Sequence, residues 1–278
     1  MLINDNKYNY FEGIRLDDSG HYVFDKRFDF DTDIIQLTTD TSEVKSVEGL
    51  TYYYGYEFNS KIRKADISKF RSALKHEFTN ENVFYSDEAE DFVLDGIYHM
   101  DRYKSLDDFG VVISTASYYG ENTLTGLMCK YVWEESRNDA EVADLQLIKE
   151  LAKNVTFDEQ KANEALANTT KYKDVTKRRN AIKDLKREFE KAKRSNEIFK
   201  MKKYLPSVAR VGFTNFLKFA NETEEDLYRT LDKGTEVLIC EDFVTSGFTI
   251  KEIIRFLNSV NPNNKISVYV LVNQMRDY

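Results

Sequence analysis

The feature that most constrains the fold of this chain is an apolar run that leads into two acidic residues and then into a small, hydroxyl-rich loop. Residues 237–240 read VLIC, Glu241 and Asp242 follow, and residues 243–249 read FVTSGFT. The apolar run predicts a buried parallel strand, and apolar residues at helical spacing over 250–257 predict a helix after it. The sequence therefore predicts a strand–loop–helix unit.

The loop of this unit suits a phosphate, and its acids suit a sugar. Backbone N–H groups of residues 245–249 would converge at the helix N-terminus, where free donors and the helix dipole favour an anion. Gly247 permits close approach of the backbone, and hydroxyls on Thr245, Ser246 and Thr249 add donors. Carboxylates at the carboxyl end of the strand are acceptors for a pair of ribose hydroxyls. The residues alone predict a ribose-phosphate site.

Residues 237–249 resemble the PRPP-binding motif of the type I phosphoribosyltransferases, which has four hydrophobic residues, an acid pair, two mostly apolar residues and a Thr/Ser-Thr/Ser-Gly-x-Thr ending. The resemblance implies that Glu241 and Asp242 are the catalytic pair, holding the ribose 2′- and 3′-hydroxyls of PRPP. Phe243 is bulkier than the aliphatic residue usual in the family. The resemblance also implies that the 5′-phosphate is bound by Thr245, Ser246, Gly247, Phe248 and Thr249.

A second strand–loop–helix unit is predicted earlier in the chain. An apolar run over residues 109–113 leads into small polar residues, and apolar residues recur at helical spacing from Leu124 onward. The family carries its pyrophosphate-binding loop after the first core strand. The resemblance therefore implies that the leaving pyrophosphate, with its Mg²⁺, is held here by Ser114, Thr115, Ala116 and Ser117.

Further strands complete an alternation of strands and helices. We expect them at residues 143–149, around 207–211 and at 265–272. This alternation predicts an α/β fold with a doubly wound, mainly parallel sheet, as in the type I phosphoribosyltransferases, and a ligand at the carboxyl ends of the strands. The first of these strands ends near that edge, where Lys149 or Lys153 would meet the pyrophosphate, as a basic residue often does in the family.

Residues 1–104 are predicted to form a β-rich and helical region, which is a candidate for the hood over the active site. Residues 21–58 are rich in Tyr, Phe and Thr, with alternation typical of short antiparallel strands. Apolar residues at helical spacing after Asp66 and after Ser86 predict two amphipathic helices. The phosphoribosyltransferase-like core is then expected over residues 105–278.

A long helical insertion, over about residues 154–205, interrupts the predicted core. Residues 171–203 contain fourteen Lys or Arg against five Asp or Glu, a net charge of +9, so the rest of the chain carries −17 of the total of −8. A narrow apolar seam runs through this charge and suits packing against one helix, in this chain or in a second copy. The seam consists of Ile182, Leu185, Phe189 and Ala192. A solvated hairpin, a dimer contact and a nucleic-acid-binding arm all fit this pattern.

Composition favours a cytoplasmic protein without a structural metal. No stretch reaches the roughly 20 apolar residues that cross a bilayer, and residues 1–7 lack the apolar core of a signal peptide. Cys129 and Cys240 both fall in predicted core elements, so neither a disulfide framework nor a zinc site is expected. The three histidines lack metal-ligand spacing: His21, His76 and His99.

The resemblance implies a Mg²⁺-dependent glycosyltransferase of nucleotide metabolism, a pentosyltransferase that moves the 5-phosphoribosyl group from PRPP to a nitrogenous base or amine. Its transition state resembles an oxocarbenium ion, so positioning and charge neutralisation replace a protein nucleophile. The alternative is a non-catalytic PRPP- or nucleotide-binding regulatory module, with or without a nucleic-acid-contacting arm. PRPP synthetases share the fold, but the Glu-Asp pair fits transferases better. We expect a homo-oligomer, with the helical arm as one route to a dimer.

Overall fold

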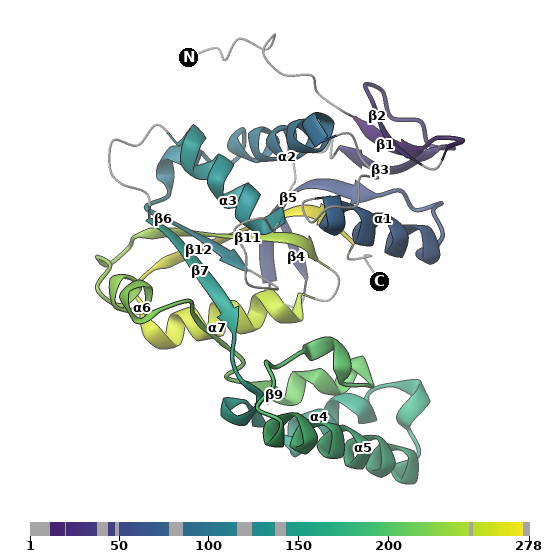
Figure 1. Cartoon of the computed structure of the whole chain (residues 1–278), viewed down its shortest axis with the longest axis vertical. Helices are drawn as coiled ribbons and strands as arrows, with labels where there is room; N and C mark the ends of the chain where they lie inside the picture. The colour runs from purple at the N-terminus through teal and green to yellow at the C-terminus, as the bar shows by residue number, and fades with distance from the viewer. Residues whose placement is uncertain are drawn as a thin grey trace.

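A single β-sheet forms the centre of the molecule (Figure 1). The computed structural model describes residues 12–19, 21–37, 44–47, 50–77, 86–115, 124–136, 143–244 and 247–274. Within these ranges the sheet has ten strands. In spatial order they are β10 (Leu217–Phe219), β7 (Ala143–Lys149), β6 (Val111–Thr115), β11 (Glu236–Val244), β12 (Lys265–Asn273), β5 (Leu50–Phe58), β3 (Asp33–Leu37), β1 (Gly13–Leu16) and β2 (Tyr22–Asp25), and β4 (Val44–Val47) also pairs with β5.

The middle of the sheet is parallel, as the alternation of strands and helices predicted. β6 pairs in parallel with β7 and with β11, β11 pairs in parallel with β12, and β12 pairs in parallel with β5. On the outer edge of β7, the short strand β10 is antiparallel. The α/β class with a largely parallel central sheet is therefore confirmed.

Helices cover both faces of this sheet (Figure 1). On one face lie α1 (Lys64–Glu77), α2 (Ser86–Asp101) and α3 (Leu124–Glu135), and on the other lie α6 (Glu222–Arg229) and α7 (Phe248–Val260). Since successive side chains of a strand point to opposite faces of the sheet, β11 contributes residues to the hydrophobic clusters on both faces. Leu238 and Cys240 join the cluster under α2 and α3, and Val237 and Ile239 join the cluster over α7. Cys240 is fully buried, as is Cys129, so the prediction of core positions for both is confirmed.

The N-terminal strands are antiparallel to one another, as predicted for residues 21–58. β1 pairs with β2 and β3, while β3 and β4 pair with β5. Along its other edge, however, β5 pairs in parallel with β12, with Tyr53 opposite Tyr269. The regions predicted as residues 1–104 and 105–278 thus share one sheet, and a division between them remains a prediction.

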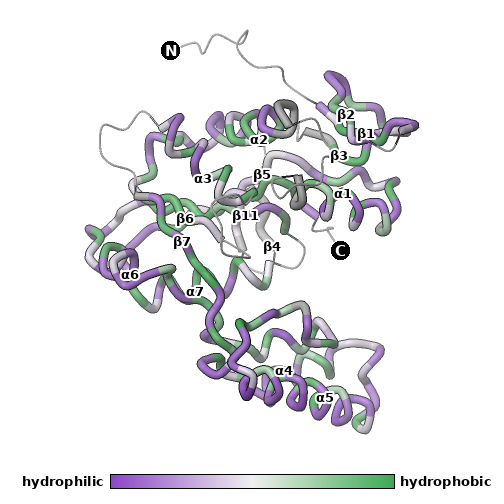
Figure 2. The backbone as a smooth tube through the Cα atoms, in the orientation of Figure 1, coloured by the Kyte–Doolittle hydropathy of each residue, from purple (hydrophilic) through white to green (hydrophobic). Residues whose placement is uncertain are grey.

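The helical insertion folds as a small subdomain with a core of its own. It contains the short helices η2 (Ala152–Asn154), η3 (Thr170–Tyr172), η4 (Met201–Lys203) and η5 (Ser207–Gly212), the helices α4 (Glu159–Ala167) and α5 (Val175–Arg194), and the two-stranded ribbon β8 (Thr156–Phe157) and β9 (Phe213–Thr214). Figure 2 shows hydrophilic and hydrophobic residues alternating along α5. The apolar seam of α5 is buried in this subdomain, so the packing partner of the seam lies in the same chain.

Aromatic rings fill the centre of the subdomain. The ring centroid of Phe213 lies 5.0 Å from that of Phe189 and 4.9 Å from those of Phe199 and Tyr204. All four side chains are at most 2% exposed. Such edge-on and tilted ring contacts add to the free energy of burial, so a few large side chains stabilise this small unit.

The strand predicted around residues 207–211 is wrong, because this segment is the 3-10 helix η5. Its buried residues, Ala209 and Gly212, are three positions apart, whereas Val208, the residue before Ala209, is 38% exposed. That spacing is the period of a 3-10 helix and not the period of two of a strand. Pro206, which precedes the helix, has no N–H to give to a sheet. The strand beside β7 is β10, a few residues later.

Asp33, at the start of β3, is a buried carboxyl group in the N-terminal sheet. It is fully buried, the Asp29 N–H donates to its Oδ2 (2.5 Å), and its Oδ1 has no hydrogen-bond partner. Burial, together with the neighbouring carboxylate of Asp25, raises the pKa of Asp33 to about 6. The charged form therefore destabilises the folded state.

Replacing Asp33 with Asn is expected to stabilise the protein at neutral pH. Because the folded pKa of Asp33 lies above its unfolded value, wild-type stability falls as the pH rises from about 4 to about 6. Asp33→Asn should remove this loss of folding free energy. The loss is up to about 3 kcal/mol, because a pKa difference of one unit corresponds to about 1.4 kcal/mol. Thermal unfolding at pH 7.5 and at pH 4 would measure it, with the exposed Asp18→Asn as control. An equal change at both pH values would contradict the assignment.

Candidate functional site

The topology places one switch point in the sheet, between β6 and β11. The chain leaves β6 through α3 and returns at β7 on one side, and it leaves β11 through α7 and returns at β12 on the other. In open α/β sheets, ligands bind in the crevice at the carboxyl ends of two such strands. In register, Ser114 of β6 lies opposite Cys240 of β11, so both polar strand ends predicted from the sequence meet at this point.

The acid pair occupies the end of β11. Asp242 is 7% exposed, and its Oδ1 accepts a hydrogen bond from the N–H of Phe243 (2.7 Å). Glu241 is half-buried, and the hydroxyl of Thr115 donates to its Oε2 and lies 3.2 Å from the carbonyl oxygen of Cys240. Thr115 was predicted to hold pyrophosphate. The structure brings its hydroxyl to the carboxylate, where it orients one oxygen of Glu241, and its role toward pyrophosphate stays a prediction.

The start of α7 supplies backbone donors beside the acid pair. Gly247 is buried and has φ 65° and ψ 0°, the left-handed conformation that a side chain would strain. Its carbonyl oxygen accepts from the N–H of Lys251 (2.9 Å), and it is followed at once by Phe248 and Thr249 in the first turn. The first N–H groups of a helix have no partner within it, so this 13-residue helix presents donors at the carboxyl edge of the sheet.

The remaining predicted site residues are distributed around this edge. Ser114 is 4% exposed. Lys149 is the last residue of β7. Because Leu147 of β7 lies opposite Thr115 of β6, Lys149 lies two residues farther toward the carboxyl edge than Thr115. β6 lies between β7 and β11, so Lys149 is two strands away from the acid pair. Lys153 is exposed on η2 in the subdomain. The other predicted residues lie outside the described ranges: Ala116, Ser117, Thr245 and Ser246.

Arg71 of α1 is a charged residue at this edge that the sequence reasoning missed. Its Nη1 donates to Oε1 of Gln274 (2.9 Å), and its guanidinium carbon lies 5.0 Å from the centre of the Phe243 ring. Burial lowers the pKa of Arg71, while the negative charges of Asp242 and Glu241 raise it. The signal was present in the sequence, because Arg71 is four residues after Ile67 on the apolar stripe of α1, where a cation is out of place.

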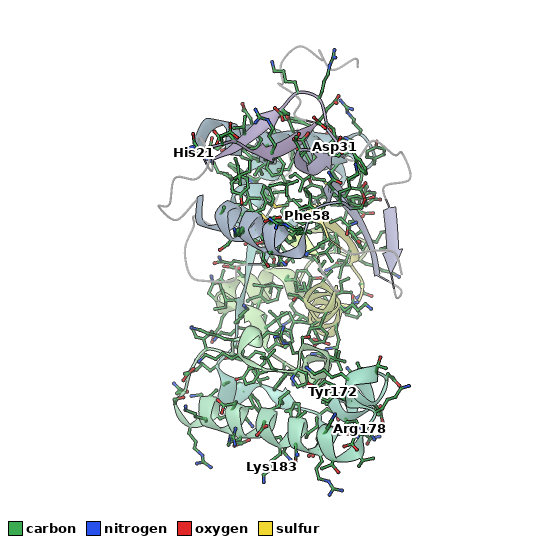
Figure 3. All side chains as sticks on the ribbon, turned by 90° about the vertical axis from the view of Figure 1, so that its right-hand side faces the viewer. His21, Asp31, Phe58, Tyr172, Arg178 and Lys183 are labelled. Carbon is green, nitrogen blue, oxygen red and sulfur yellow. The ribbon has the colours of Figure 1, made fainter. Side chains whose placement is uncertain are left out.

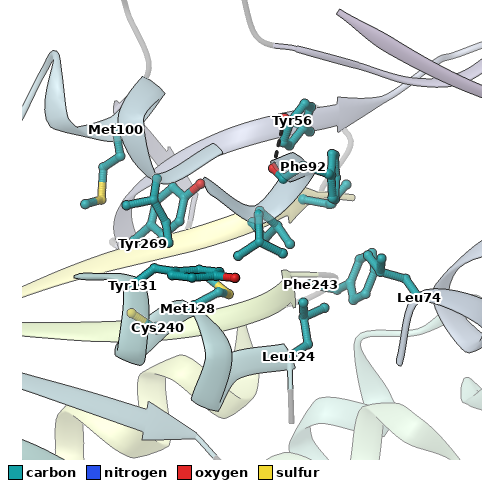
Figure 4. Close-up of a cluster of buried hydrophobic side chains, with 14 of the residues drawn as sticks. Tyr56, Leu74, Phe92, Met100, Leu124, Met128, Tyr131, Cys240, Phe243 and Tyr269 are labelled. Carbon is teal, nitrogen blue, oxygen red and sulfur yellow. Dashed lines mark hydrogen bonds between the residues drawn. The ribbon is translucent and has the colours of Figure 1, made fainter. Parts of the chain in front are cut away.

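Phe243 links the acid pair to the N-terminal region. Its ring stacks on Phe58 of β5 at 6.2 Å and meets Phe70 of α1 edge-on at 6.5 Å. Figure 4 shows Phe243 at the end of β11, facing Leu74 of α1. The bulk that distinguishes this position from the aliphatic residue usual in the motif is thus accommodated by β5 and by α1, the helix that carries Arg71.

The helical subdomain also reaches this edge. Phe216, buried in the subdomain core, stacks on Phe248 of α7 with ring centroids 6.1 Å apart. Farther along the same helix, Nη2 of Arg255 lies 3.4 Å from Oδ1 of Asn215. The insertion is therefore anchored to the helix whose N-terminus faces the site.

The described residues hold no group of three or more His, Cys, Asp or Glu side chains arranged to bind a metal ion. None of the described helices combines the length and apolar character that a membrane-spanning segment requires.

Comparison with known proteins finds a family match over the C-terminal part of the chain. Residues 214–278 match the family model of the phosphoribosyl transferase domain. The matched segment runs from β9 past β12 and so includes the acid pair and the N-terminus of α7. No curated protein with a significantly similar sequence was found. The resemblance seen in residues 237–249 is thereby confirmed, and the protein carries a phosphoribosyl transferase domain over residues 214–278.

Proposed function

We propose that this protein binds PRPP at the switch point between β6 and β11, transfers its 5-phosphoribosyl group to a nitrogenous base or amine, and releases pyrophosphate. The observation that carries this proposal is the position of Glu241 and Asp242, beside the N-terminus of α7 at the carboxyl edge. A sugar hydroxyl pair and a phosphate held side by side are the recognition elements of a ribose 5-phosphate.

Each described group has a task in this proposal. Glu241 and Asp242 accept hydrogen bonds from the ribose 2′- and 3′-hydroxyls, and Thr115 fixes the orientation of Glu241 through its hydroxyl. The first N–H groups of α7, held open by the left-handed Gly247, bind the 5′-phosphate. With the sugar fixed at both ends, its anomeric carbon is held in line between acceptor and leaving group, which lowers the entropic cost of the transition state.

Magnesium fits the donor set at this edge. The groups present are carboxylate and hydroxyl oxygens, on Glu241, Asp242 and Thr115, and oxygen ligands are those that Mg²⁺ prefers. Bound with PRPP, Mg²⁺ supplies charge neutralisation of the departing pyrophosphate. Glu241 and Asp242 are the residues that would hold it through the ribose, and Lys149 adds a positive charge at the same edge.

Arg71 supports this site from α1, and replacing it is expected to weaken PRPP binding. Its guanidinium partly offsets the negative charge of the acid pair, and within the described structure only its Nη1 forms a hydrogen bond. Loss of a charged hydrogen-bond donor at a half-buried site costs about 1.5–3 kcal/mol. Arg71→Met should therefore raise the dissociation constant for PRPP about tenfold or more, and Arg71→Lys should raise it less, as isothermal titration would measure.

The matched control for Arg71 is Lys69→Met, an exposed position on the same helix. Its PRPP affinity should equal that of the wild type. If Arg71→Met, folded by circular dichroism, also binds PRPP like the wild type, Arg71 serves only to pack α1 on Phe243.

Turnover tests the transferase proposal directly. The purified protein is incubated with PRPP, Mg²⁺ and a panel of nucleobases and amines, and pyrophosphate release is measured. We expect release that depends on one acceptor class and that is lost with the acid pair. PRPP binding without release for any acceptor would contradict transfer and would favour a regulatory PRPP-binding module.

A further inference from the structure

The helical subdomain has a charged outer face that the proposed transfer reaction does not use. α5 buries one side in the aromatic core and exposes the other to solvent. Figure 3 shows Lys183 at the outer end of the molecule, on the side of the subdomain away from the sheet. Four exposed cations along this face form what we call the basic ridge: Arg179, Lys183, Lys191 and Arg194.

The four cations of the basic ridge have no acidic partner among the described residues, whereas three other cations of α5 are paired with carboxylates. Lys186 pairs with Glu159 (2.7 Å), Arg187 with Asp184 (3.2 Å) and Lys193 with Glu190 (3.7 Å). None of the four ridge side chains forms an ion pair with a described residue. The helix dipole favours cations in the last turn, which accounts for Lys191 and Arg194 but not for the two ridge residues two or more turns earlier.

The geometry of the ridge is linear. At 100° per residue, its members fall within about a third of the circumference of the helix, and the 15 residue-to-residue steps from Arg179 to Arg194 span about 22 Å at 1.5 Å per step. The side chains are carried by a helix whose inner face is fixed by buried Ile182, Leu185 and Phe189. A fixed row of this length matches an extended, repeating anion better than a single phosphate group.

We propose that the basic ridge binds the phosphate backbone of a nucleic acid. The charge of the whole chain supports this partner: residues 171–203 carry +9 and the remainder carries −17, so the net charge of the insertion favours a long polyanion and that of the body disfavours it. No base-reading element accompanies the ridge within the described residues, so the binding is electrostatic and independent of sequence. The proposal does not depend on the transferase activity.

The test is fluorescence anisotropy with labelled 20-nucleotide single strands and the matching duplex, at salt concentrations from 50 to 200 mM. A ridge variant combines R179Q, K183Q, K191Q and R194Q. A control variant combines K26Q, K69Q, K161Q and K233Q, four exposed lysines with no ion pair to a described residue, so both variants change the net charge by the same amount. Glutamine has about the same helix propensity as the Lys and Arg residues that it replaces.

We expect the wild type to bind with an affinity that falls steeply with salt. The ridge variant should bind at least tenfold more weakly at 50 mM salt, and the slope of log affinity against log salt should become shallower by about 3, since each lost phosphate contact removes about 0.7–0.9. The control variant should bind within about threefold of the wild type. Both variants should bind PRPP like the wild type, so absence of nucleic-acid binding can be distinguished from absence of the PRPP site.

Several results would overturn the proposal. One is absence of binding at 50 mM salt, and another is equal loss in the ridge and control variants. Binding to phosphatidylserine vesicles without binding to nucleic acid would assign the ridge to a lipid surface. Self-association of the wild type that the ridge variant loses, again without nucleic-acid binding, would assign it to the acidic body of a second copy.

Discussion

Replacing Glu241 with Gln and Asp242 with Asn together should weaken PRPP binding at least a hundredfold, about 2.7 kcal/mol, and leave the protein folded. In the proposed site each carboxylate accepts a charge-assisted hydrogen bond from a ribose hydroxyl, worth about 1.5–3 kcal/mol, whereas an amide has one acceptor oxygen and no charge. The fold should persist because an Asn oxygen can still accept from the Phe243 N–H. Isothermal titration with PRPP and Mg²⁺ measures the loss.

Glu236→Gln is the matched control for this double variant. Glu236 lies at the opposite end of β11, where it pairs with Lys265 (3.1 Å) and stands near Lys104 (3.8 Å). It has the same chemistry in the same strand but faces the amino edge, so PRPP affinity should not change. Wild-type affinity in a folded Glu241→Gln, Asp242→Asn variant would remove the ribose site from the proposal and leave the motif a structural role.

The second large effect is expected in the subdomain, where Phe213→Ala should destabilise it by about 3–5 kcal/mol. The Phe213 side chain is fully buried, and its ring touches those of Phe157, Phe189, Phe199 and Tyr204. A core this small cannot collapse around the space that a phenyl ring leaves. We expect hydrogen exchange to lose protection in α4 and α5, while the parallel strands β6, β11 and β12 keep theirs.

Val208→Ala is the comparison for Phe213→Ala. Val208 lies on η5 a few residues earlier and is 38% exposed, so its truncation should leave exchange in α4 and α5 unchanged. If Phe213→Ala instead abolishes protection throughout the sheet, the subdomain and the sheet unfold as one cooperative unit.

The parts of the fold that the sequence predicted well are those with strong local patterns. β11 and β12 are mostly apolar strands, and burial on both faces leaves hydrophobic stretches that are visible in the sequence. The predicted bounds agree with the structure for β7 and within one residue for β12, whereas β11 extends to Val244, beyond the predicted apolar run 237–240. The segment at residues 207–211 was misjudged because three apolar positions in five fit several periods, and the exposure of Val208 decides among them.

The parts that were missed depend on contacts between distant segments. Nothing near β5 indicates that it pairs in parallel with β12, because that pairing joins residues such as Tyr53 and Tyr269. The same holds for the site. The strand–loop–helix motif is local and could be predicted from the sequence. The position of Arg71 beside Phe243 and Asp242 could not, because it results from how α1 packs on the end of β11.

The parallel pairing of β5 with β12 also sets an order of events during synthesis. Tyr54 of β5 lies opposite Val270 of β12, so β5 waits for more than two hundred further residues to be translated before one of its edges is covered. Until then it can pair only with its N-terminal neighbours β3 and β4. Contacts of such high sequence separation form slowly, and an open strand edge is prone to pair with other chains. The nascent protein therefore passes through a long interval in which aggregation competes with completion of the sheet.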